Sequence, residues 1–266
     1  MSVRVLITGA AGGIGRAAAA ELRARGARVA GLDRHAGGEI VACDVRDQAG
    51  VDAAVAEAVE RLGGLDVLVN NAGVGTPQSA GAPPDDAALA VLDVNLIGPW
   101  RVTAAALPHL RAARGRVLNV ASALAFVTLP FAPAYCMSKR GLVAYSDALR
   151  LEHGDAITVT TVYPGYIRTG IHAESTAAGL ALEGAVPPER VTDAARTIAR
   201  AALGPPRRDL ATTRAGAAGY ALARLAPRSL VDRVVRRRIG ALARRGHFGA
   251  SELAAEFARR AAGVRP

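Results

Sequence analysis

The chain has little of several things that would define other classes of protein. Its 266 residues include only two cysteines, Cys43 and Cys136, too few for a disulfide framework or a four-thiolate zinc site. The five histidines show no metal-ligand spacing, so no metal is expected. No apolar run approaches the roughly 20 residues that cross a bilayer, and the N-terminus lacks a signal-peptide pattern. These absences favour a protein of the reducing cytoplasm.

Lysine and aromatic residues are also scarce. Lys139 is the only lysine among 33 basic residues, and aromatic side chains make up 4% of the chain. The arginines are consistent with a coding bias toward Arg and Ala, which leaves the one lysine at a position where arginine does not serve. Apolar residues make up 51%, enough for a buried core, and the length suits one large α/β domain.

The net charge of +10 is confined to the end of the chain. Basic and acidic residues balance over residues 1–206, whereas residues 207–266 hold fourteen arginines and four acidic residues. Apolar side chains recur there at helical spacing, namely Leu222, Leu225, Val231, Val234, Val235, Ile239 and Leu242. We expect a helical extension in which Ser251 caps a last helix over residues 252–262.

Three roles for this extension are open from the sequence. It can form a lid or an oligomer contact with a solvated arginine face. It can instead lie on an anionic membrane surface, which would make the protein peripheral. Nucleic-acid binding is the third role, but no such partner is expected because the aromatic side chains that stack on bases are scarce.

Residues 1–206 alternate short apolar runs with amphipathic segments. Strands are expected over residues 3–7, 28–32, 39–42, 67–70, 116–120, 158–162 and 209–213. Helices are expected over residues 15–25, 47–62, 85–110, 134–153 and 191–203, with Pro99 and Pro108 kinking or interrupting the third. The alternation predicts a Rossmann-type α/β fold with a doubly wound parallel sheet. We expect one domain, catalytic over residues 1–206 and extended over residues 207–266.

A glycine-rich loop connects the first strand to the first helix. Residues 8–15 run Thr-Gly-Ala-Ala-Gly-Gly-Ile-Gly, which lets backbone approach a pyrophosphate at a helix N-terminus. Asp33 ends the second strand, where a carboxylate accepts hydrogen bonds from the adenosine ribose. Its charge repels a 2′-phosphate and therefore predicts NAD, although the adjacent Arg34 could neutralise it and admit NADP.

Tyr135 and Lys139 stand four residues apart in a predicted helix and therefore share one face. A lysine cation one turn away favours the phenolate and lowers the tyrosine pKa from its usual value of about 10. Tyr135 can then take a proton from a substrate hydroxyl, or return it to a carbonyl oxygen, as hydride is transferred. Ser122 ends the fifth strand and can hydrogen-bond the same oxygen.

Several motifs in order make the chain resemble the short-chain dehydrogenase/reductase family. They are the glycine pattern at residues 8–15, Asn70-Asn71-Ala72-Gly73, Tyr135-x-x-x-Lys139 and the segment Pro164–Thr169. Asn95 stands 27 residues before Ser122, and Ser122 stands 13 before Tyr135, spacings that fit the family's catalytic tetrad. The likeness covers about residues 3–204.

The resemblance implies roles for individual residues. In the implied tetrad of Asn95, Ser122, Tyr135 and Lys139, Asn95 holds a water that relays protons from Lys139, which also binds the nicotinamide ribose. Asp44 and Val45 are implied at the adenine, and Thr169 at the carboxamide. The implied cofactor contacts are Gly9, Gly13, Ile14, Gly15, Asp33, Asp44, Val45, Asn71, Ala72, Gly73, Tyr135, Lys139, Pro164, Gly165, Ile167 and Thr169. A homo-oligomer is also implied.

The chain departs from the family pattern between Asp33 and Val41. Only seven residues lie there, so the helix that most members place between the second and third strands is missing or reduced. We therefore expect the adenine side of the cofactor site to be more open. Of two further residues near the site, Cys136 is expected to pack internally. His172 is expected to be a solvated loop side chain, with a position in the wall of a substrate pocket as the alternative.

Apolar segments flank the predicted nicotinamide position. Residues 123–131, the pair Tyr166 and Ile167, and residues 177–182 favour an apolar secondary alcohol or ketone as substrate. The sequence thus predicts an NAD(H)-dependent oxidoreductase. The alternatives are an NADPH-dependent ketone reductase and a dinucleotide-binding regulatory or scaffold protein that acts through its basic tail.

Overall fold

The computed structural model describes residues 2–180 and 188–261. Within them, seven strands form one parallel sheet in the order β3-β2-β1-β4-β5-β6-β7. The strands are β1 (Arg4–Thr8), β2 (Arg28–Asp33), β3 (Ile40–Ala42), β4 (Val67–Asn70), β5 (Arg116–Val120), β6 (Thr158–Tyr163) and β7 (Asp209–Ala211). Each matches an expected apolar run to within two residues at either end.

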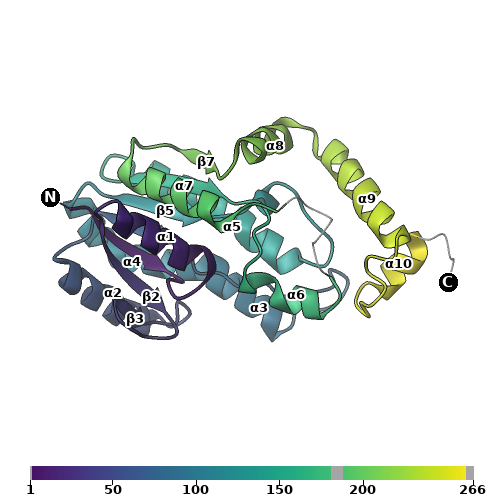
Figure 1. The fold of residues 1–266 in the computed structure, drawn as a ribbon, viewed down its shortest axis with the longest axis horizontal. Coiled ribbons are helices and arrows are strands. Elements are labelled where there is room, and N and C mark those ends of the chain that lie inside the picture. The colour runs from purple at the N-terminus through teal and green to yellow at the C-terminus, as the bar shows by residue number, and fades with distance from the viewer. Residues whose placement is uncertain (1, 181–187, 262–266) are drawn as a thin grey trace.

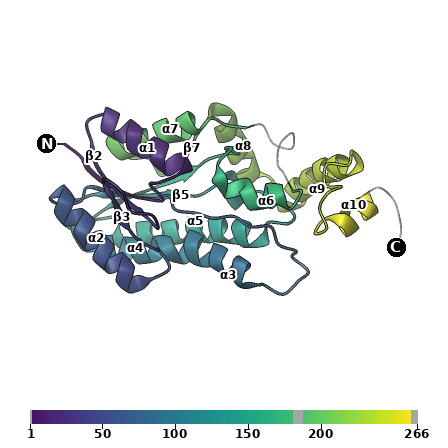
Figure 2. The same ribbon diagram turned by 60° about the horizontal axis from the view of Figure 1, so that its bottom comes forward.

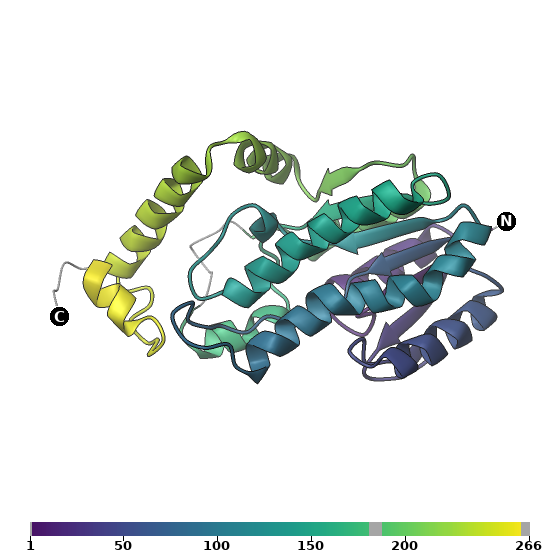
Figure 3. The ribbon, with the colours of Figure 1, turned by 180° about the vertical axis from the view of Figure 1, so that it is seen from behind.

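Helices cover both faces of the sheet. α1 (Gly13–Ala24) and α7 (Val191–Leu203) lie together on one face (Figure 1). On the other face lie α2 (Gln48–Leu62), α4 (Gly98–Ala112) and α5 (Pro133–His153), seen from behind in Figure 3. Each face has its own apolar core. The prediction of a doubly wound Rossmann-type sheet is confirmed.

The central strands are apolar on both sides because both sides are covered. In β1, Val5, Leu6 and Ile7 are fully buried and contribute alternately to the two cores. All strands run in one direction, so their carboxyl ends meet at one edge. The strand order reverses between β1 and β4, and a crevice forms at the edge beyond such a point.

No helix lies between β2 and β3, as the sequence predicts. Gly37 and Ile40 bond to each other in both directions across a short turn, and Gly38 takes a φ of +57° that favours glycine. The chain therefore returns to the sheet within a few residues, and the surface beside Asp33 carries no helical cover.

The segment expected as one interrupted helix contains α3 (Asp86–Leu92), a π-helical turn η1 (Asp93–Ile97) and α4. In the π turn the N–H of Gly98 donates to the carbonyl of Asp93, five residues earlier. Pro99 has no N–H to donate to the carbonyl of Asn95, which agrees with the break from the α-helical pattern here. Pro108, by contrast, lies inside α4 without interrupting it.

The extension is helical and reaches away from the sheet along the long axis of the molecule (Figure 1, Figure 2). It contains α8 (Arg214–Leu225), α9 (Arg228–Arg244) and α10 (Ala255–Ala261). The last helix starts at Ala255 rather than at residue 252, after a turn in which the N–H of Ala255 donates to the carbonyl of Glu252 at 3.2 Å. The hydroxyl of Ser251 accepts the N–H of Ala254 at 3.4 Å, which is the hydrogen bond of the expected cap. Residue 262, the expected end of that helix, lies outside the described residues.

The far end of the extension packs back onto the main body. Phe248, Ile239 and Ala243 bury themselves against Leu180 and Phe131. Residues 181 and 182 of the expected apolar segment lie outside the described residues. In the part of the chain that is described, no helix combines the length and apolar character needed to cross a membrane.

Candidate active site

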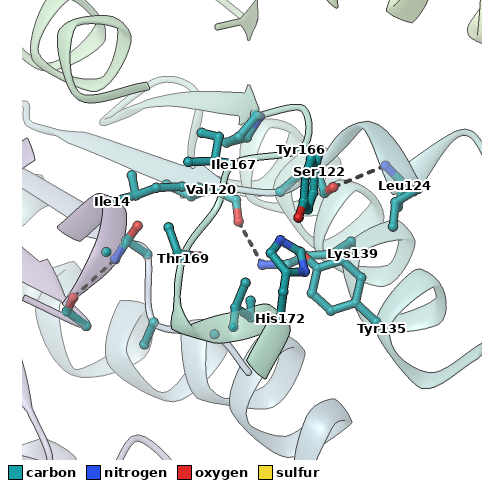
Figure 4. Close-up of a pocket in the computed structure, with 18 of the residues that line it drawn as sticks. Ile14, Val120, Ser122, Leu124, Tyr135, Lys139, Tyr166, Ile167, Thr169 and His172 are labelled. Atoms are coloured by element: carbon teal, nitrogen blue, oxygen red, sulfur yellow. Dashed lines mark hydrogen bonds between the residues drawn. The ribbon is translucent and has the colours of Figure 1, made fainter. Parts of the chain in front are cut away.

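A cavity of about 350 Å³ lies at the carboxyl edge of the sheet (Figure 4). The ends of β1, β2, β4, β5 and β6 all contribute to its walls. It brings together most of the residues that the sequence singles out: Gly9, Gly13, Ile14, Asp33, Asn71, Ala72, Gly73, Ser122, Tyr135, Lys139, Pro164, Gly165, Ile167 and Thr169.

At one end of the cavity the glycine loop leaves room that a side chain would fill. A Cβ on Gly15 would lie 2.1 Å from the carbonyl oxygen of Gly9, and Gly9 itself has a φ of +68°. A Cβ on Gly13 would lie 3.4 Å from Cγ2 of Thr169 across the cavity. No side chain caps the first turn of α1, whose N–H groups and dipole favour an anion. This cradle fits the pyrophosphate of a dinucleotide.

Asp33 lies against the same loop. Its carboxylate accepts the N–H of Ala11 at 3.0 Å, and its side chain is half-buried in the cavity wall. The side chain of Arg34 is exposed beside it. The negative charge thus faces the place where the ribose of a bound dinucleotide would lie.

The loop after β4 is fixed to the end of β1. The hydroxyl of Thr8 accepts the N–H groups of Asn71 and Ala72 at 3.0 and 2.9 Å, and the Asn71 amide donates to the Thr8 carbonyl at 2.9 Å. Because one hydroxyl holds two consecutive N–H groups, the wall formed by residues 71–73 is rigidly placed opposite the glycine loop.

At the other end of the cavity, Ser122, Tyr135 and Lys139 converge (Figure 4). The ammonium of Lys139 donates to the Val120 carbonyl at 3.0 Å and lies 5.7 Å from the centre of the Tyr135 ring. Burial lowers the pKa of Lys139 to about 8. Burial raises the pKa of Tyr135 to about 12, while a hydrogen bond with Ser122 acts in the opposite direction. Tyr135 is therefore a protonated phenol at neutral pH.

Asn95 is fully buried beside this group, outside the cavity lining. Its amide exchanges two hydrogen bonds with the backbone of Val74, at 2.8 and 2.9 Å, and donates to the hydroxyl of Ser138 at 3.2 Å. Gly73 separates it from Lys139: a Cβ there would lie 3.3 Å from Oδ1 of Asn95 and 3.6 Å from Nζ of Lys139. The π turn η1 thus places Asn95 next to Gly73, and Gly73 alone separates it from Lys139.

Three residues of the expected cofactor contacts lie outside the cavity. Gly15 underlies the glycine loop rather than facing the ligand space. Asp44 is bound by the guanidinium of Arg46, with the shortest contact at 2.6 Å, and this pairing lowers the Asp44 pKa. Val45 is buried against Gly98. The adenine contacts of Asp44 and Val45 stay predictions.

Other residues reach the site without having been predicted. Val120 supplies the carbonyl that holds Lys139. His172 takes the second of its two expected positions, since it lines the cavity, and its ring centre lies 4.8 Å from that of Tyr166. Cys136 is buried, as expected. Sequence spacing gave no sign of Val120, because any strand-end residue supplies a carbonyl.

A second, smaller cavity continues from Tyr135 and His172 toward the extension. Its walls are mostly apolar. Two of the residues that line it, Ile239 and Phe248, stand more than 100 positions after Tyr135 in the sequence. The Phe131 ring lies 6.5 Å from that of Phe248, and its backbone φ of +63° is a strained conformation for phenylalanine. The extension therefore closes one side of the space next to the catalytic tyrosine candidate.

The fold and this grouping of side chains define an α/β protein with a dinucleotide-sized crevice and a Tyr–Lys pair. The chain belongs to the short-chain dehydrogenase family, whose model matches residues 3–179. A short chain dehydrogenase from Burkholderia cenocepacia in complex with NADP has the same fold, with a TM-score of 0.75 and 25% identity. That likeness covers 88% of this chain and 99% of the other.

Two human dehydrogenases are among the relatives in sequence. Human 17-beta-hydroxysteroid dehydrogenase type 6 is 40% identical over 184 residues, and human retinol dehydrogenase 16 is 39% identical over 188. Both matches cover 63% of this chain but only 57% of the relative. A 3-ketoacyl-(acyl-carrier-protein) reductase from Brucella melitensis, complexed with NADH, superimposes with a TM-score of 0.72 at 27% identity, over 79% of this chain and 96% of that one.

Proposed function

We propose that this chain is an NAD(P)-dependent oxidoreductase that interconverts an apolar secondary alcohol and its ketone, with NAD(H) as the preferred cofactor. One observation carries the proposal. Ser122, Tyr135 and Lys139 stand at one end of a cavity whose other end is formed by the glycine loop and Asp33. A ligand that spans this distance would place its reactive ring beside the tyrosine and its phosphates at the helix.

A bound nicotinamide would supply the hydride acceptor or donor. In alcohol oxidation the Oη of Tyr135 takes the hydroxyl proton, and Ser122 holds the same substrate oxygen by a hydrogen bond. Burial raises the pKa of Tyr135 and the hydrogen bond with Ser122 acts against this rise. The ammonium of Lys139, 5.7 Å from the ring centre, would also favour the phenolate as it forms. In the reverse direction the neutral phenol donates its proton to the carbonyl oxygen.

Proton exchange with solvent would run past Lys139 toward Asn95. Pro99 cannot donate to the Asn95 carbonyl, so this acceptor lacks the partner that an α-helix would give it. A water held there would lie on the side of Gly73 that faces away from the cavity, and it could exchange protons with the buried lysine ammonium. The Asn95 relay implied by family resemblance is thus supported by the π turn.

The preference for NAD(H) rests on Asp33. Its carboxylate lies in the cavity wall at the end of β2 and would accept ribose hydroxyls, whereas a 2′-phosphate would meet a negative charge. Arg34 is exposed and supports the alternative of NADPH-dependent ketone reduction if it turns toward the phosphate. Relatives occur with either cofactor, since one solved structure holds NADP and another NADH.

The apolar character of the substrate follows from the second cavity. Leu124, Leu129, Phe131 and Leu180 face it from the main body, and Phe248 closes it from the extension. A polyhydroxylated sugar or a charged acid would lose hydrogen bonds to water there without replacement. The names of the two human relatives specify a 17-beta-hydroxysteroid, which is an apolar secondary alcohol, and retinol, which is an apolar primary alcohol.

Calorimetric titration with NADH and NADPH tests the cofactor half without knowledge of the substrate. Calorimetry is preferable to Trp100 fluorescence because Trp100 stacks on Tyr145 away from the cavity. Tighter NADH binding supports the Asp33 assignment, and tighter NADPH binding selects the reductase alternative. Folded protein that binds neither cofactor overturns the proposal.

Turnover of a panel of apolar secondary alcohols tests the other half. Protein that binds NADH but oxidises none of them, and reduces none of the ketones, favours the scaffold alternative. We also propose that residues 1–206 act as the catalytic unit, that residues 207–266 complete its substrate side, and that the protein is a homo-oligomer of the cytoplasm.

A further inference from the structure

Helix α9 presents two different faces. On its inner face, Val235, Ile239 and Ala243 pack into the cluster that also holds Phe248, and Ile239 lines the second cavity. These side chains recur every four residues, so they form one stripe along the helix. The inner face therefore accounts for the docking of α9 onto the main body.

The outer face of α9 also carries apolar side chains, and these are exposed. Leu230 and Val234, four residues apart, are 46% and 57% exposed. Leu230 stands nine residues before Ile239, which places it on the opposite side of the helix. In α8, Leu222 and Leu225 are 69% and 83% exposed. This concentration of large exposed apolar side chains marks an interaction surface.

Arginines flank this apolar line. Arg233, Arg237 and Arg244 fall on one side of it, and Arg238 and Arg245 on the other, by helical spacing. All are exposed, as are Arg228 and Arg236. Within residues 2–180 and 188–261, none of these seven side chains forms an ion pair, and the only acidic residue of α9 is Asp232. The outer face thus combines apolar side chains with unneutralised positive charge.

We propose that the outer face of α9, together with the exposed leucines of α8, docks on an anionic lipid surface. Leucine and valine enter the acyl boundary while the long arginine side chains reach the lipid phosphates. A second copy of the chain is a poor occupant, because like charges would face one another. Nucleic acid is a poor occupant too, because Tyr220, the aromatic residue of α8, stacks inward on Tyr163.

The two faces belong to one helix, and this joins the docking surface to the cavity. With the outer face on lipid, the inner face and the cavity beside Tyr135 lie one helix diameter from the membrane. An apolar substrate could then enter from the lipid instead of from water. That last step rests on the proposed function. The docking itself rests only on α8 and α9, so it can be confirmed or refuted independently of the proposed enzymatic activity.

Vesicle co-sedimentation tests the docking with the full chain. The probes are phosphatidylcholine vesicles with and without about 30% phosphatidylglycerol, at low and high salt. We expect binding to the anionic vesicles alone, lost at high salt. The triple variant Arg233→Gln, Arg237→Gln, Arg238→Gln should bind roughly 100-fold more weakly. Leu230→Ser should lower the partition into anionic vesicles about tenfold at low salt, because it removes apolar area and no charge.

A matched variant removes the same charge from the main body. Arg111→Gln, Arg114→Gln, Arg196→Gln changes three exposed arginines away from the extension and should bind as the wild type does. Circular dichroism and NADH titration show that each variant is folded. Wild type that ignores anionic vesicles overturns the proposal, and so does equal loss in both triple variants. Binding to duplex nucleic acid or self-association with the same arginine dependence, in place of vesicle binding, would assign the face to those partners instead.

Discussion

The main body and the extension use arginine in different ways. In the body, Arg4 meets Asp66 at 2.7 Å, Arg150 meets Asp147 at 2.6 Å, and their backbone contacts tie strands to neighbouring elements. In α9 the arginines have no carboxylate partners within the described residues. The same residue type is thus internally neutralised where it serves the fold and left charged where it faces outward.

Exposed apolar side chains occur in both regions, but in different surroundings. The body exposes Leu89, Trp100, Met137 and Leu151 on α3, α4 and α5, whereas the extension exposes Leu222, Leu225, Leu230 and Val234 on two consecutive helices. Surface ion pairs contribute little stability, about 0–1 kcal/mol each, so the pairing in the body matters chiefly for neutrality and position. What distinguishes α9 is therefore the combination of exposed apolar side chains with arginines that have no carboxylate partner within the described residues.

Tyr135→Phe should give the largest effect and should separate the two regions most sharply. The variant keeps the ring that packs beside Lys139 but loses the hydroxyl that moves the proton. Turnover of an apolar secondary alcohol should fall about 10³- to 10⁴-fold. Affinity for NADH and for anionic vesicles should stay unchanged. Retained turnover would remove Tyr135 from the mechanism.

Phe248→Ala should show whether the extension shapes the substrate cavity. Phe248 is buried and lines that cavity, so its truncation should cost about 3 kcal/mol of unfolding free energy and widen the space beside Tyr135. The ratio of kcat/KM for a bulky over a small alcohol should rise. Phe257→Ala is the matched control, since Phe257 packs on Phe131 at 5.6 Å but lies outside the cavity lining. An equal change in both variants would deny Phe248 a role in specificity.

Lys139→Met should reveal how much unfolding free energy is lost by burying Lys139, the one lysine of the chain. The native pKa is lowered from 10.5 to about 8, so between these values the unfolded chain binds more protons than the folded one. The stability of the wild type at this position therefore rises with pH across that window, by up to about 3 kcal/mol. The variant lacks this rise, so its advantage in urea unfolding should be largest near pH 7 and shrink toward pH 10. A constant difference would contradict a lowered lysine pKa.

Asp33→Asn should give the smallest effect of these four. The amide keeps the size of the side chain and can still meet the Ala11 N–H through its oxygen. Removal of the charge should raise affinity for NADPH about tenfold relative to NADH. Arg34→Ala should shift the ratio the other way. If neither variant moves the ratio, the preference lies elsewhere in the site.

Much of the body could be predicted from local patterns. Each strand is a short apolar run, and residues 8–15 specify their turn because Gly9 has positive φ and Gly15 has no room for a Cβ. The missing helix after Asp33 follows from the shortness of the segment alone. Tyr135 and Lys139 meet through helical spacing, which is also local.

The features that the sequence did not disclose depend on contacts between distant residues. Phe248 and Ile239 reach the cavity only through packing on Phe131 and Leu180, which no spacing encodes. The pairing of Asp44 with Arg46 competes with the adenine contact that family resemblance implies. In the extension, helical periodicity picked out a single apolar set that holds both the exposed Val234 and the buried Ile239. It did not include Leu230 and could not say which of these side chains would be covered.

The single lysine makes the protein open to a simple chemical assay. Lys139 is 4% exposed, faces the cavity, and has a pKa of about 8, so a far larger fraction of it is a free amine at neutral pH than of an ordinary lysine. Every other side-chain cation among the 33 basic residues is a guanidinium, which acylating reagents spare. A small amine-directed reagent should therefore label one side chain. In the presence of a dinucleotide, the fraction of protein labelled at Lys139 would report the fraction of sites that the dinucleotide leaves unoccupied.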